Sequence, residues 1–374
     1  MKIGILTQPL HNNYGGLFQC YALQTILKRM GHDAIVLQRT WGNPPLLVNL
    51  YNEARGFLHW LRKVRKKGYP YTMAKKVEIH TRAFAKKYIF PRSTLLYSTK
   101  SLTKASIGID TFVVGSDQVW RPMYSPCIEN YFLDFAQRRN VRRIAYAASF
   151  GIDEWEFTDE QTALCAPLAR MFDAISVRED SAVGLCSKYL GVDATHVLDP
   201  TLLLARENYE ALAIAEGETP SSGNLFCYVL DDGIETQELV RQIAERTSFT
   251  PFYCMPLRKY SINEHCGEIS DYVYPSPTRW LRSFMDAEMV FTDSFHGCIF
   301  SIIFNKPFWV IGNKKRGMAR FCSLLSMFDL EQRIVTPETF CMIDVLAPID
   351  WEKVRNRHEE WRDKSIRFLM ESLG

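Results

Sequence analysis

The residue whose type and setting point most directly to chemistry is His296, in the stretch TDSFHGCIF from Thr292 to Phe300. Apolar residues before it predict a buried strand. The apolar run after it predicts a helix, for which Asp293 and Ser294 supply capping side chains. His296 would then lie where the carboxyl end of a strand meets a helix amino terminus. Open α/β sheets bind ligands at that edge, and helix starts favour anions. The alternative is that the histidine only caps the turn.

Several polar and charged residues are candidates to share a site with His296. A histidine beside fixed cations suits a substrate that carries phosphate and carboxylate groups. As catalytic groups we name His296 and Asp117. As binding residues we name Arg178, Asn13, Gly15, Ser116, Ser294, Lys314, Arg316 and Arg320. The alternative for each arginine is a surface or ion-paired position.

Two other kinds of site are poorly supported by the sequence. Asp293, Ser294 and His296 have the residue types of a hydrolase triad, but neighbours on one turn rarely point at each other, and no GxSxG motif is present. No HExxH or Cys/His cluster occurs, and His196 with Asp199 is an isolated spacing of little specificity. We therefore expect no metal and no cofactor.

The candidate residues follow strands of an α/β pattern. Predicted strands cover Lys2–Thr7, Ala34–Leu37, Thr111–Val114, Arg143–Ala148, Ala174–Val177 and His196–Leu198. Most of them end in polar or glycine-containing turns, where α/β domains build their sites. The loop QPLHNNYGG precedes a predicted helix at Leu17–Met30. Gly15 and Gly16 lack the GxGxxG spacing of a dinucleotide site, but they suit a turn whose backbone lies close to an anionic ligand.

A second α/β series follows the Gly-, Pro- and Ser-containing segment EGETPSSG, the best candidate for a linker. Its predicted strands are Asn224–Leu230, Phe252–Met255, Met289–Thr292 and Phe308–Ile311, and its predicted helices are Glu235–Arg246, Arg279–Met285 and Gly297–Phe304. The sequence thus predicts an α/β protein with one domain at 1–215, a second at 224–345, and a C-terminal helix at 351–373 that folds back across the first. Two such domains would place both sets of strand ends on one cleft.

The segment Arg55–Arg92 differs from the rest of the chain, with twelve Lys or Arg residues and one acid, Glu78. Leu58, Leu61 and Val64 indicate a basic amphipathic helix, and we expect a helical insertion at about 52–92. One interpretation is peripheral contact with anionic lipid headgroups or with a phosphorylated glycan carrier. The alternative is a solvated insertion.

Composition narrows the class of protein. The 374 residues are 47% hydrophobic and 13% aromatic, which is enough for two packed cores. A net charge of +3 does not indicate a nucleic-acid partner. Ten cysteines without a CxxC pair favour reduced thiols, and no window approaches the roughly 18 to 20 apolar residues of a membrane span. We expect a cytoplasmic protein, peripheral to the inner face of the membrane if the basic segment binds there.

Seven segments in order resemble the polysaccharide pyruvyl transferase family. They are MKIGILTQPLHNNYGGLFQCYALQTILKRMGHD, FVVGSDQVWRP, YFLDF, IAYAASFG, AISVREDSAV, HVLDPTLLL and TDSFHGCIFSIIFNKPFWV. The resemblance implies two Rossmann-like domains facing across a cleft, as in B-type glycosyltransferases. It also implies transfer of a pyruvyl group from phosphoenolpyruvate to two hydroxyls of a sugar in a surface or exopolysaccharide precursor, which forms a cyclic ketal. The acceptor would be a saccharide, either free or linked to lipid or nucleotide.

By motif position, His296 matches the essential histidine of that family, and Arg178 matches its arginine at the end of a first-domain strand. In the mechanism that we expect, His296 donates a proton, Arg178 binds the donor and Asp117 accepts a hydroxyl proton. One departure stands out, because studied members have an arginine where this chain has Ser294. Two alternatives stay open: a glycosyltransferase that uses a nucleotide sugar, and a non-catalytic member that binds glycans.

Overall fold

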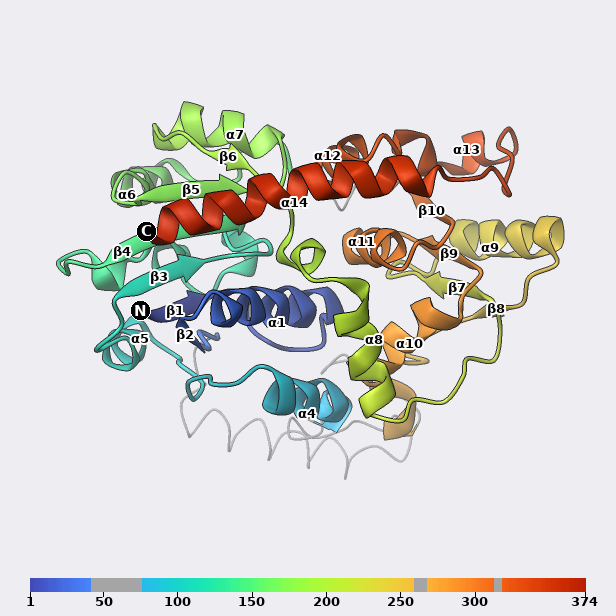
Figure 1. Ribbon diagram of the computed structural model, residues 1–374, viewed down its shortest axis with the longest axis horizontal. Helices are drawn as coiled ribbons and strands as arrows, with labels where there is room; N and C mark the ends of the chain where they lie inside the picture. Colours follow the sequence, from blue (N-terminus) through green and yellow to red (C-terminus); the bar gives the residue numbers. More distant parts are fainter. Residues whose placement is uncertain (42–75, 259–267, 313–317) are drawn as a thin grey trace, which may run out of the picture.

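The computed structural model describes residues 1–41, 76–258, 268–312 and 318–374. These residues form two Rossmann-like α/β domains, each built on a parallel sheet (Figure 1). The first sheet has the strand order β2-β1-β3-β4-β5-β6, and the second has the order β11-β10-β9-β7-β8. In both sheets the order reverses beside the first strand of the domain, so each has a switch point at which α/β proteins bind ligands.

The strands of the first sheet are β1 (Lys2–Leu6), β2 (Asp33–Val36), β3 (Thr111–Val114), β4 (Arg142–Ala148), β5 (Ala174–Val177) and β6 (Thr195–His196). Those of the second are β7 (Leu225–Tyr228), β8 (Pro251–Phe252), β9 (Met289–Thr292), β10 (Phe308–Ile311) and β11 (Ile334–Val335). Every residue of β3, β7, β9 and β10 is buried, as expected of apolar strands in a parallel sheet. The predicted ranges of β3, β5, β9 and β10 are confirmed to the residue.

The α-helices of the first domain are α1 (Tyr14–Arg29), α4 (Ile79–Tyr88), α5 (Thr99–Ala105), α6 (Asp159–Ala169), α7 (Ser181–Leu185) and α8 (Arg206–Ala215). Those of the second are α9 (Ile234–Thr247), α10 (Pro277–Asp286), α11 (Phe295–Ile303), α12 (Ala319–Met327), α13 (Pro337–Phe340) and the terminal α14 (Trp351–Leu373). The prediction of α14 is confirmed at both ends. The helix that starts at Ser181 is α-helical only as far as Leu185, and Cys186–Leu190 continue it as a π-helix.

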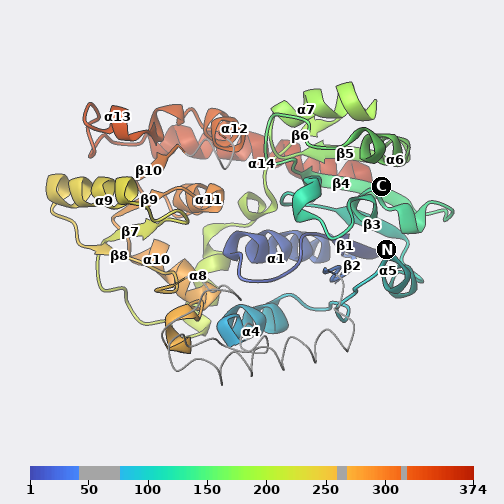
Figure 2. The ribbon, with the colours of Figure 1, turned by 180° about the vertical axis from the view of Figure 1, so that it is seen from behind.

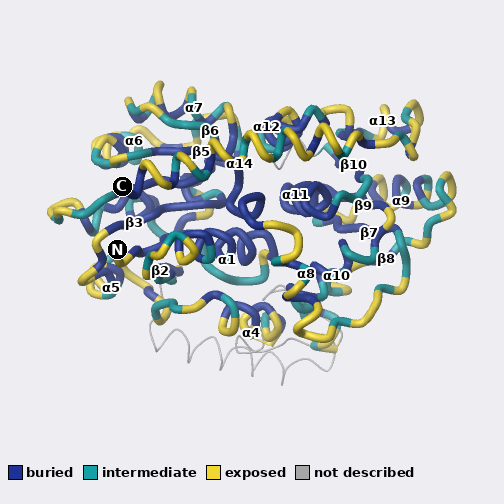
Figure 3. The backbone as a smooth tube through the Cα atoms, in the orientation of Figure 1, coloured by how far each residue is buried: buried dark blue, intermediate teal, exposed yellow. Residues whose placement is uncertain are grey.

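The two domains are joined by a shared aromatic core. Phe18 of α1 stacks on Trp280 of α10 with ring centroids 5.6 Å apart, and it lies 5.4 Å from Phe300 of α11. Tyr14 also contacts Trp280, at 5.6 Å. All four side chains are buried, and α1 and α11 are dark along most of their length in Figure 3. Because large aromatic contacts dominate packing energetics, this junction fixes α1 relative to α11, and each of these helices begins beside a predicted site residue.

Helix α14 lies across both domains, as the front and rear views show (Figures 1 and 2). Near its start, Lys353 pairs with Asp329 of the second domain at 3.1 Å. Toward its end, the Ser365 hydroxyl accepts a hydrogen bond from the Leu198 amide at 3.0 Å, in the first domain. The helix therefore holds the two domains together, because it contacts the second domain near its start and the first domain toward its end.

Helix α1 begins three residues before its predicted start. The Asn13 side chain caps it by accepting a hydrogen bond from the Gly16 amide at 3.2 Å. Gly15 and Gly16, which we predicted to lie in a loop, are therefore in the first helical turn. The strongly basic part of the predicted insertion, with Leu58, lies outside the described residues, and α4 is the portion that the structure describes.

Candidate active site

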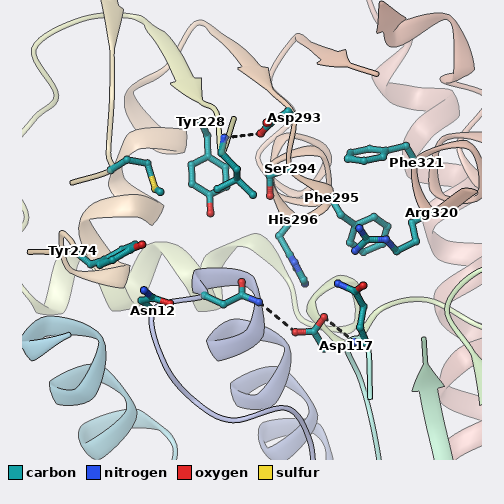
Figure 4. Close-up of a pocket in the computed structure, with 14 residues that line it drawn as sticks. Asn12, Asp117, Tyr228, Tyr274, Asp293, Ser294, Phe295, His296, Arg320 and Phe321 are labelled. Carbon is teal, nitrogen blue, oxygen red and sulfur yellow. Dashed lines mark hydrogen bonds between the residues drawn. The ribbon is translucent and has the colours of Figure 1, made fainter. Parts of the chain in front are cut away.

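A pocket of about 260 Å³ lies between the two domains, where the switch points of both sheets face each other (Figure 4). The first domain contributes the turns after β1 and β3, and the second contributes the turns after β7, β8 and β9 together with α12. The lining residues are Asn12, Asn13, Asp117, Gln118, Tyr228, Leu230, Met255, Tyr274, Asp293, Ser294, Phe295, His296, Arg320 and Phe321.

His296 lies in the first turn of α11, which Ser294 caps by accepting a hydrogen bond from the Gly297 amide at 3.4 Å. The ring reaches across to the first domain, where its Nε2 lies 3.7 Å from Oδ2 of Asp199. The backbone of Gly15 passes directly beside the ring. His296 is thus 6% exposed and is held between the starts of α1 and α11, beside a buried carboxylate.

On the buried side of this site, Asp199 accepts hydrogen bonds from several neighbouring groups. Its Oδ1 accepts hydrogen bonds from the amide and hydroxyl of Thr201, at 3.0 and 2.7 Å, and its Oδ2 accepts one from the Ser116 hydroxyl at 3.2 Å. Burial alone would raise the pKa of the Asp199 carboxyl, but His296 and Arg178 more than offset it and hold the pKa below its ordinary value. Asp199 is therefore an anionic partner for the His296 ring.

Arg178 lies behind the pocket and is not among the lining residues. Its side chain is 1% exposed, and its Nη1 donates to Oδ2 of Asp199 at 2.9 Å. Its Nη2 lies 3.7 Å from Oδ1 of Asp117, and its Nε lies 4.0 Å from Oε2 of Glu179. Burial acts to lower the pKa of Arg178, but Asp199, Asp117 and Glu179 together raise it. Its guanidinium also stacks over the Phe295 ring at 4.5 Å, so Arg178 connects both domains.

Glu179, also fully buried, fixes the turn after β4. Its Oε1 accepts hydrogen bonds from the Ser149 hydroxyl at 2.8 Å and from the amides of Phe150 and Gly151 at 2.8 and 3.0 Å. These contacts leave Oε2 on the side of Arg178. Glu179 thus joins the turns that follow two neighbouring strands and supports the cation between them.

Asp117 lines the pocket from the turn after β3. It adopts φ 72°, a left-handed conformation that is uncommon for a residue other than glycine. Its Oδ2 accepts a hydrogen bond from Nδ2 of Asn13 at 3.3 Å, and its Oδ1 accepts one from the Gln118 amide at 2.9 Å. The Asp117 carboxylate is thereby held between Asn13 and Arg178.

Asp293 performs a different task from the helix capping that we predicted for it. Its two carboxylate oxygens accept hydrogen bonds from the amides of Leu230 and Asp231, at 2.7 and 2.8 Å. These bonds tie the turn after β7 to the turn after β9, while Ser294 provides the cap of α11. The carboxylate therefore fixes the second-domain wall of the pocket.

Arg320, in the first turn of α12, lines the pocket on the other side of Phe295. Its guanidinium lies 5.7 Å from the Phe295 ring centroid. Burial lowers its pKa to about 10, and the nearby charge of Arg178 acts in the same direction. Two cations, Arg178 and Arg320, therefore lie close to the same aromatic ring. Lys314 and Arg316, also predicted as binding residues, lie outside the described residues.

The structure thus brings together all the predicted site residues that it describes. They are His296, Asp117, Arg178, Asn13, Gly15, Ser116, Ser294 and Arg320. The prediction missed Asp199 and Glu179, which follow β6 and β5, and it missed the pocket residues Asn12, Tyr228 and Tyr274. Asp199 lies in the segment HVLDPTLLL at a strand end, and that position could have identified it as a candidate site residue. No local pattern marks Tyr274, because it reaches the pocket only through the packing of the second domain.

Within the part of the chain that the structure describes, no three His, Cys, Asp or Glu side chains are grouped so as to hold a metal ion. The centre of the site holds a histidine, carboxylates and guanidinium groups. This set can exchange a proton and can compensate the charge of an anionic ligand.

The comparison with family models matches residues 13–315 to polysaccharide pyruvyl transferase. The chain belongs to the polysaccharide pyruvyl transferase family. The matched residues include the site residues Asn13, Asp117, Arg178, Asp199 and His296. The family is one of transferases that act in polysaccharide biosynthesis, so transferase is the class of protein that the match supports. The comparison with curated proteins finds no match.

Two solved structures with the same fold are nucleotide-sugar enzymes of the B-type glycosyltransferase architecture. The UDP-GlcNAc 2-epimerase from Neisseria meningitidis, bound to UDP-GlcNAc, has a TM-score of 0.52 at 11% identity and covers 100% of this chain and 99% of its own. The UDP-GlcNAc 2-epimerase from Methanocaldococcus jannaschii has a TM-score of 0.52 at 11% identity, with coverages of 99% and 100%. At this identity the likeness concerns the fold, and it confirms the predicted architecture.

None of the helices formed by the described residues combines the length and the apolar character that crossing a membrane requires.

Proposed function

We propose that this protein transfers a pyruvyl group from phosphoenolpyruvate to two hydroxyls of a sugar in a surface or exopolysaccharide precursor, forming a cyclic ketal. The observation that carries the proposal is the setting of His296. The ring lines a pocket between the domains, lies 3.7 Å from the buried carboxylate of Asp199, and shares that pocket with Arg320. A proton donor beside cations suits an anionic enol ester.

The reaction begins with protonation of the methylene carbon of phosphoenolpyruvate. His296, as its imidazolium, gives up this proton, and the adjacent carbon becomes electrophilic. A sugar hydroxyl adds to that carbon, and the C–O bond to phosphate then breaks. The second hydroxyl closes the ketal. One hydroxyl proton restores the charge of His296, and the other leaves with inorganic phosphate, so that atoms and charge balance.

Asp199 supports the histidine in this scheme. Because Asp199 is buried and ionised, it places a negative charge 3.7 Å from Nε2 of the ring. Arg178 holds Asp199 in turn through the 2.9 Å contact of its Nη1. The effect of Arg178 on the reaction therefore includes the placement of a carboxylate, in addition to the attraction that its charge exerts on the donor.

Asp117 is placed to accept the proton of the attacking hydroxyl and to pass it to the departing phosphate, because its carboxylate lines the same pocket as the His296 ring. Arg320 supplies a cation near the position at which other family members have an arginine and this chain has Ser294. General acid catalysis contributes about 100- to 10,000-fold, so the placement of donor and acceptor must contribute the rest of the rate enhancement. The scheme uses no metal or cofactor besides phosphoenolpyruvate as co-substrate.

The test is release of inorganic phosphate from phosphoenolpyruvate, measured with a panel of saccharides that are free, lipid-linked or nucleotide-linked. We expect release that depends on one class of acceptor, with a product that is heavier by one pyruvyl ketal in mass spectrometry. Release of UDP from a UDP-sugar, without phosphate release from phosphoenolpyruvate, would instead identify a glycosyltransferase. Saccharide binding without either reaction would identify a non-catalytic member.

A further inference from the structure

The pocket has two chemically different sides, and His296 lies between them (Figure 4). On one side Arg320 and Phe321 extend from α12. On the other side lie Tyr228 and Tyr274. The first side presents a guanidinium and an aromatic ring, whereas the second presents phenol rings with their hydroxyl groups.

Tyr228 is a rigid part of the second side. It is the last residue of β7 and is 4% exposed. Its ring lies edge-on to Trp280 with centroids 5.2 Å apart, and it stacks with Phe226 at 6.0 Å. Because its neighbours hold the ring on both sides, Tyr228 cannot leave the pocket wall without disturbing the aromatic core between the domains.

Tyr274 is half-buried and is anchored by its backbone. Its amide donates a hydrogen bond to the carbonyl of Val77 at 2.9 Å, and its ring meets the ring of Tyr14 edge-on at 6.3 Å. The Tyr14 hydroxyl donates to the carbonyl of the next residue, Pro275, at 2.9 Å. A ring fixed in this way offers a contact surface at low entropic cost.

Charge separates the two sides further. Of the described residues that line the pocket, Arg320 alone is a lysine or arginine. On the tyrosine side, the carboxylate of Asp293 accepts hydrogen bonds from the amides of Leu230 and Asp231, which stabilise its charge locally. An anionic ligand on this side would lie away from the guanidinium that could compensate its charge, and burying a charge without such compensation is costly.

We propose that the Tyr228–Tyr274 side of the pocket is the acceptor subsite and binds one neutral pyranose unit, while the anionic groups of the donor lie toward Arg320. This inference rests on the proposed function and assigns its two substrates to opposite sides of His296. The apolar face of a pyranose ring packs on a tyrosine ring, and its hydroxyls meet tyrosine hydroxyls and the amide of Asn12. Phosphoenolpyruvate, which carries phosphate and carboxylate, needs the cationic side.

The test measures sugar binding without any donor. The methyl glycosides of glucose, galactose and mannose are neutral and carry diols that a ketal could bridge, and each is titrated into the protein by calorimetry and saturation-transfer NMR. We expect at least one to bind. Tyr274→Ala should weaken that binding by about 3- to 10-fold, the value of one aromatic contact. Tyr274→Phe, which keeps the ring, should weaken it less.

Tyr97→Ala is the matched control, because Tyr97 is 37% exposed and does not line the pocket. Binding of phosphoenolpyruvate is measured separately and should be the same in Tyr274→Ala as in the wild type. Unchanged sugar binding in Tyr274→Ala, failure of all three glycosides to bind the wild type, or displacement of bound sugar by phosphoenolpyruvate would each overturn the assignment. If the wild-type protein binds sugar through Tyr274 but does not turn over phosphoenolpyruvate, only the proposed function is refuted.

Discussion

Gly15 and His296 lie so close together that no side chain fits between them. A Cβ added to Gly15 would lie 2.0 Å from Nδ1 of His296 and 2.1 Å from its Cγ. The two residues come from different domains, so the absence of a side chain in the first turn of α1 is what lets the imidazole reach Asp199. Glycine is needed here for close approach and not for an unusual backbone conformation.

Gly15→Ala should therefore displace the His296 ring and reduce turnover by about 100-fold or more, because a shift of about 1 Å at a reacting group has an effect of that order. The measurement is the single-turnover rate with phosphoenolpyruvate and an acceptor. Gly184→Ala, in α7, is the matched control, since no atom lies within 4 Å of the added methyl group. Wild-type turnover in Gly15→Ala would show that the ring position is unimportant for catalysis.

His296→Asn tests proton donation directly. The fold and the binding of phosphoenolpyruvate should remain, because the amide fits the same turn, whereas the single-turnover rate should fall by about 100- to 10,000-fold. His80→Asn, on the exposed surface of α4, is the control and should behave as the wild type. Normal turnover in His296→Asn would mean that the histidine is only part of the helix start, and the proposed mechanism would be wrong.

The sequence was sufficient to predict the fold because the buried strands are short apolar runs with polar ends. Thr111–Val114 and Met289–Thr292 are such runs, and both were placed to the residue. It was also sufficient to name most of the site, because the carboxyl ends of parallel strands converge. Helix starts were less predictable. The Asn13 side chain caps α1, so the helix begins three residues earlier than predicted. The periodicity of apolar residues does not reveal a capping contact of this kind.

The relations between residues could not be predicted from the sequence. Arg178 was predicted to bind substrate, and its pairing with Asp199 and Asp117 appears only when three strand ends meet. The contact of Gly15 with His296 depends on the packing of α1 against α11 through Phe18 and Phe300. Such contacts between distant segments leave no periodic pattern in either segment.

Asp199→Asn should destabilise the protein by about 3 to 5 kcal/mol, because it removes the closest anionic partner of a buried arginine. The measurement is the free energy of unfolding from chemical denaturation. Glu216→Gln is the control. It removes the carboxylate that pairs with Lys87 on the surface, where a pair contributes about 0 to 1 kcal/mol. Equal losses in the two variants would contradict the central place given to Asp199.

Arg320→Ala should weaken phosphoenolpyruvate binding by about 10- to 100-fold, the value of roughly 1.5 to 3 kcal/mol for a hydrogen bond to a charged group. Sugar binding in the absence of donor should stay as in the wild type, since Arg320 lies on the other side of His296. Arg241→Ala, on the exposed face of α9, controls for the loss of one positive charge. Unaltered donor affinity in Arg320→Ala would exclude this arginine as the replacement for the family residue at Ser294.

His358 gives a prediction about pH and stability. It lies on α14, where its Nε2 donates to the carbonyl of Leu202 at 2.6 Å and so fixes the helix to the first domain. Burial lowers its pKa from the ordinary value of 6.5, and the charge of Arg362 acts in the same direction, while the hydrogen bond and Glu359 oppose the shift. The folded protein therefore resists protonation of this ring more than the unfolded chain does.

The sign of the effect follows from proton uptake. As pH falls through 6.5, the unfolded chain binds a proton at this position before the folded protein does, so stability is complete above that pH and is lost below it. His358→Gln keeps a donor for the Leu202 carbonyl but does not titrate. The midpoint of thermal unfolding should therefore fall less between pH 7.5 and 5.5 in His358→Gln than in the wild type, whereas His80→Gln, at an exposed position, should leave the fall unchanged. An equal fall of the unfolding midpoint in the wild type and in His358→Gln would show that this histidine does not govern the attachment of α14 at acid pH.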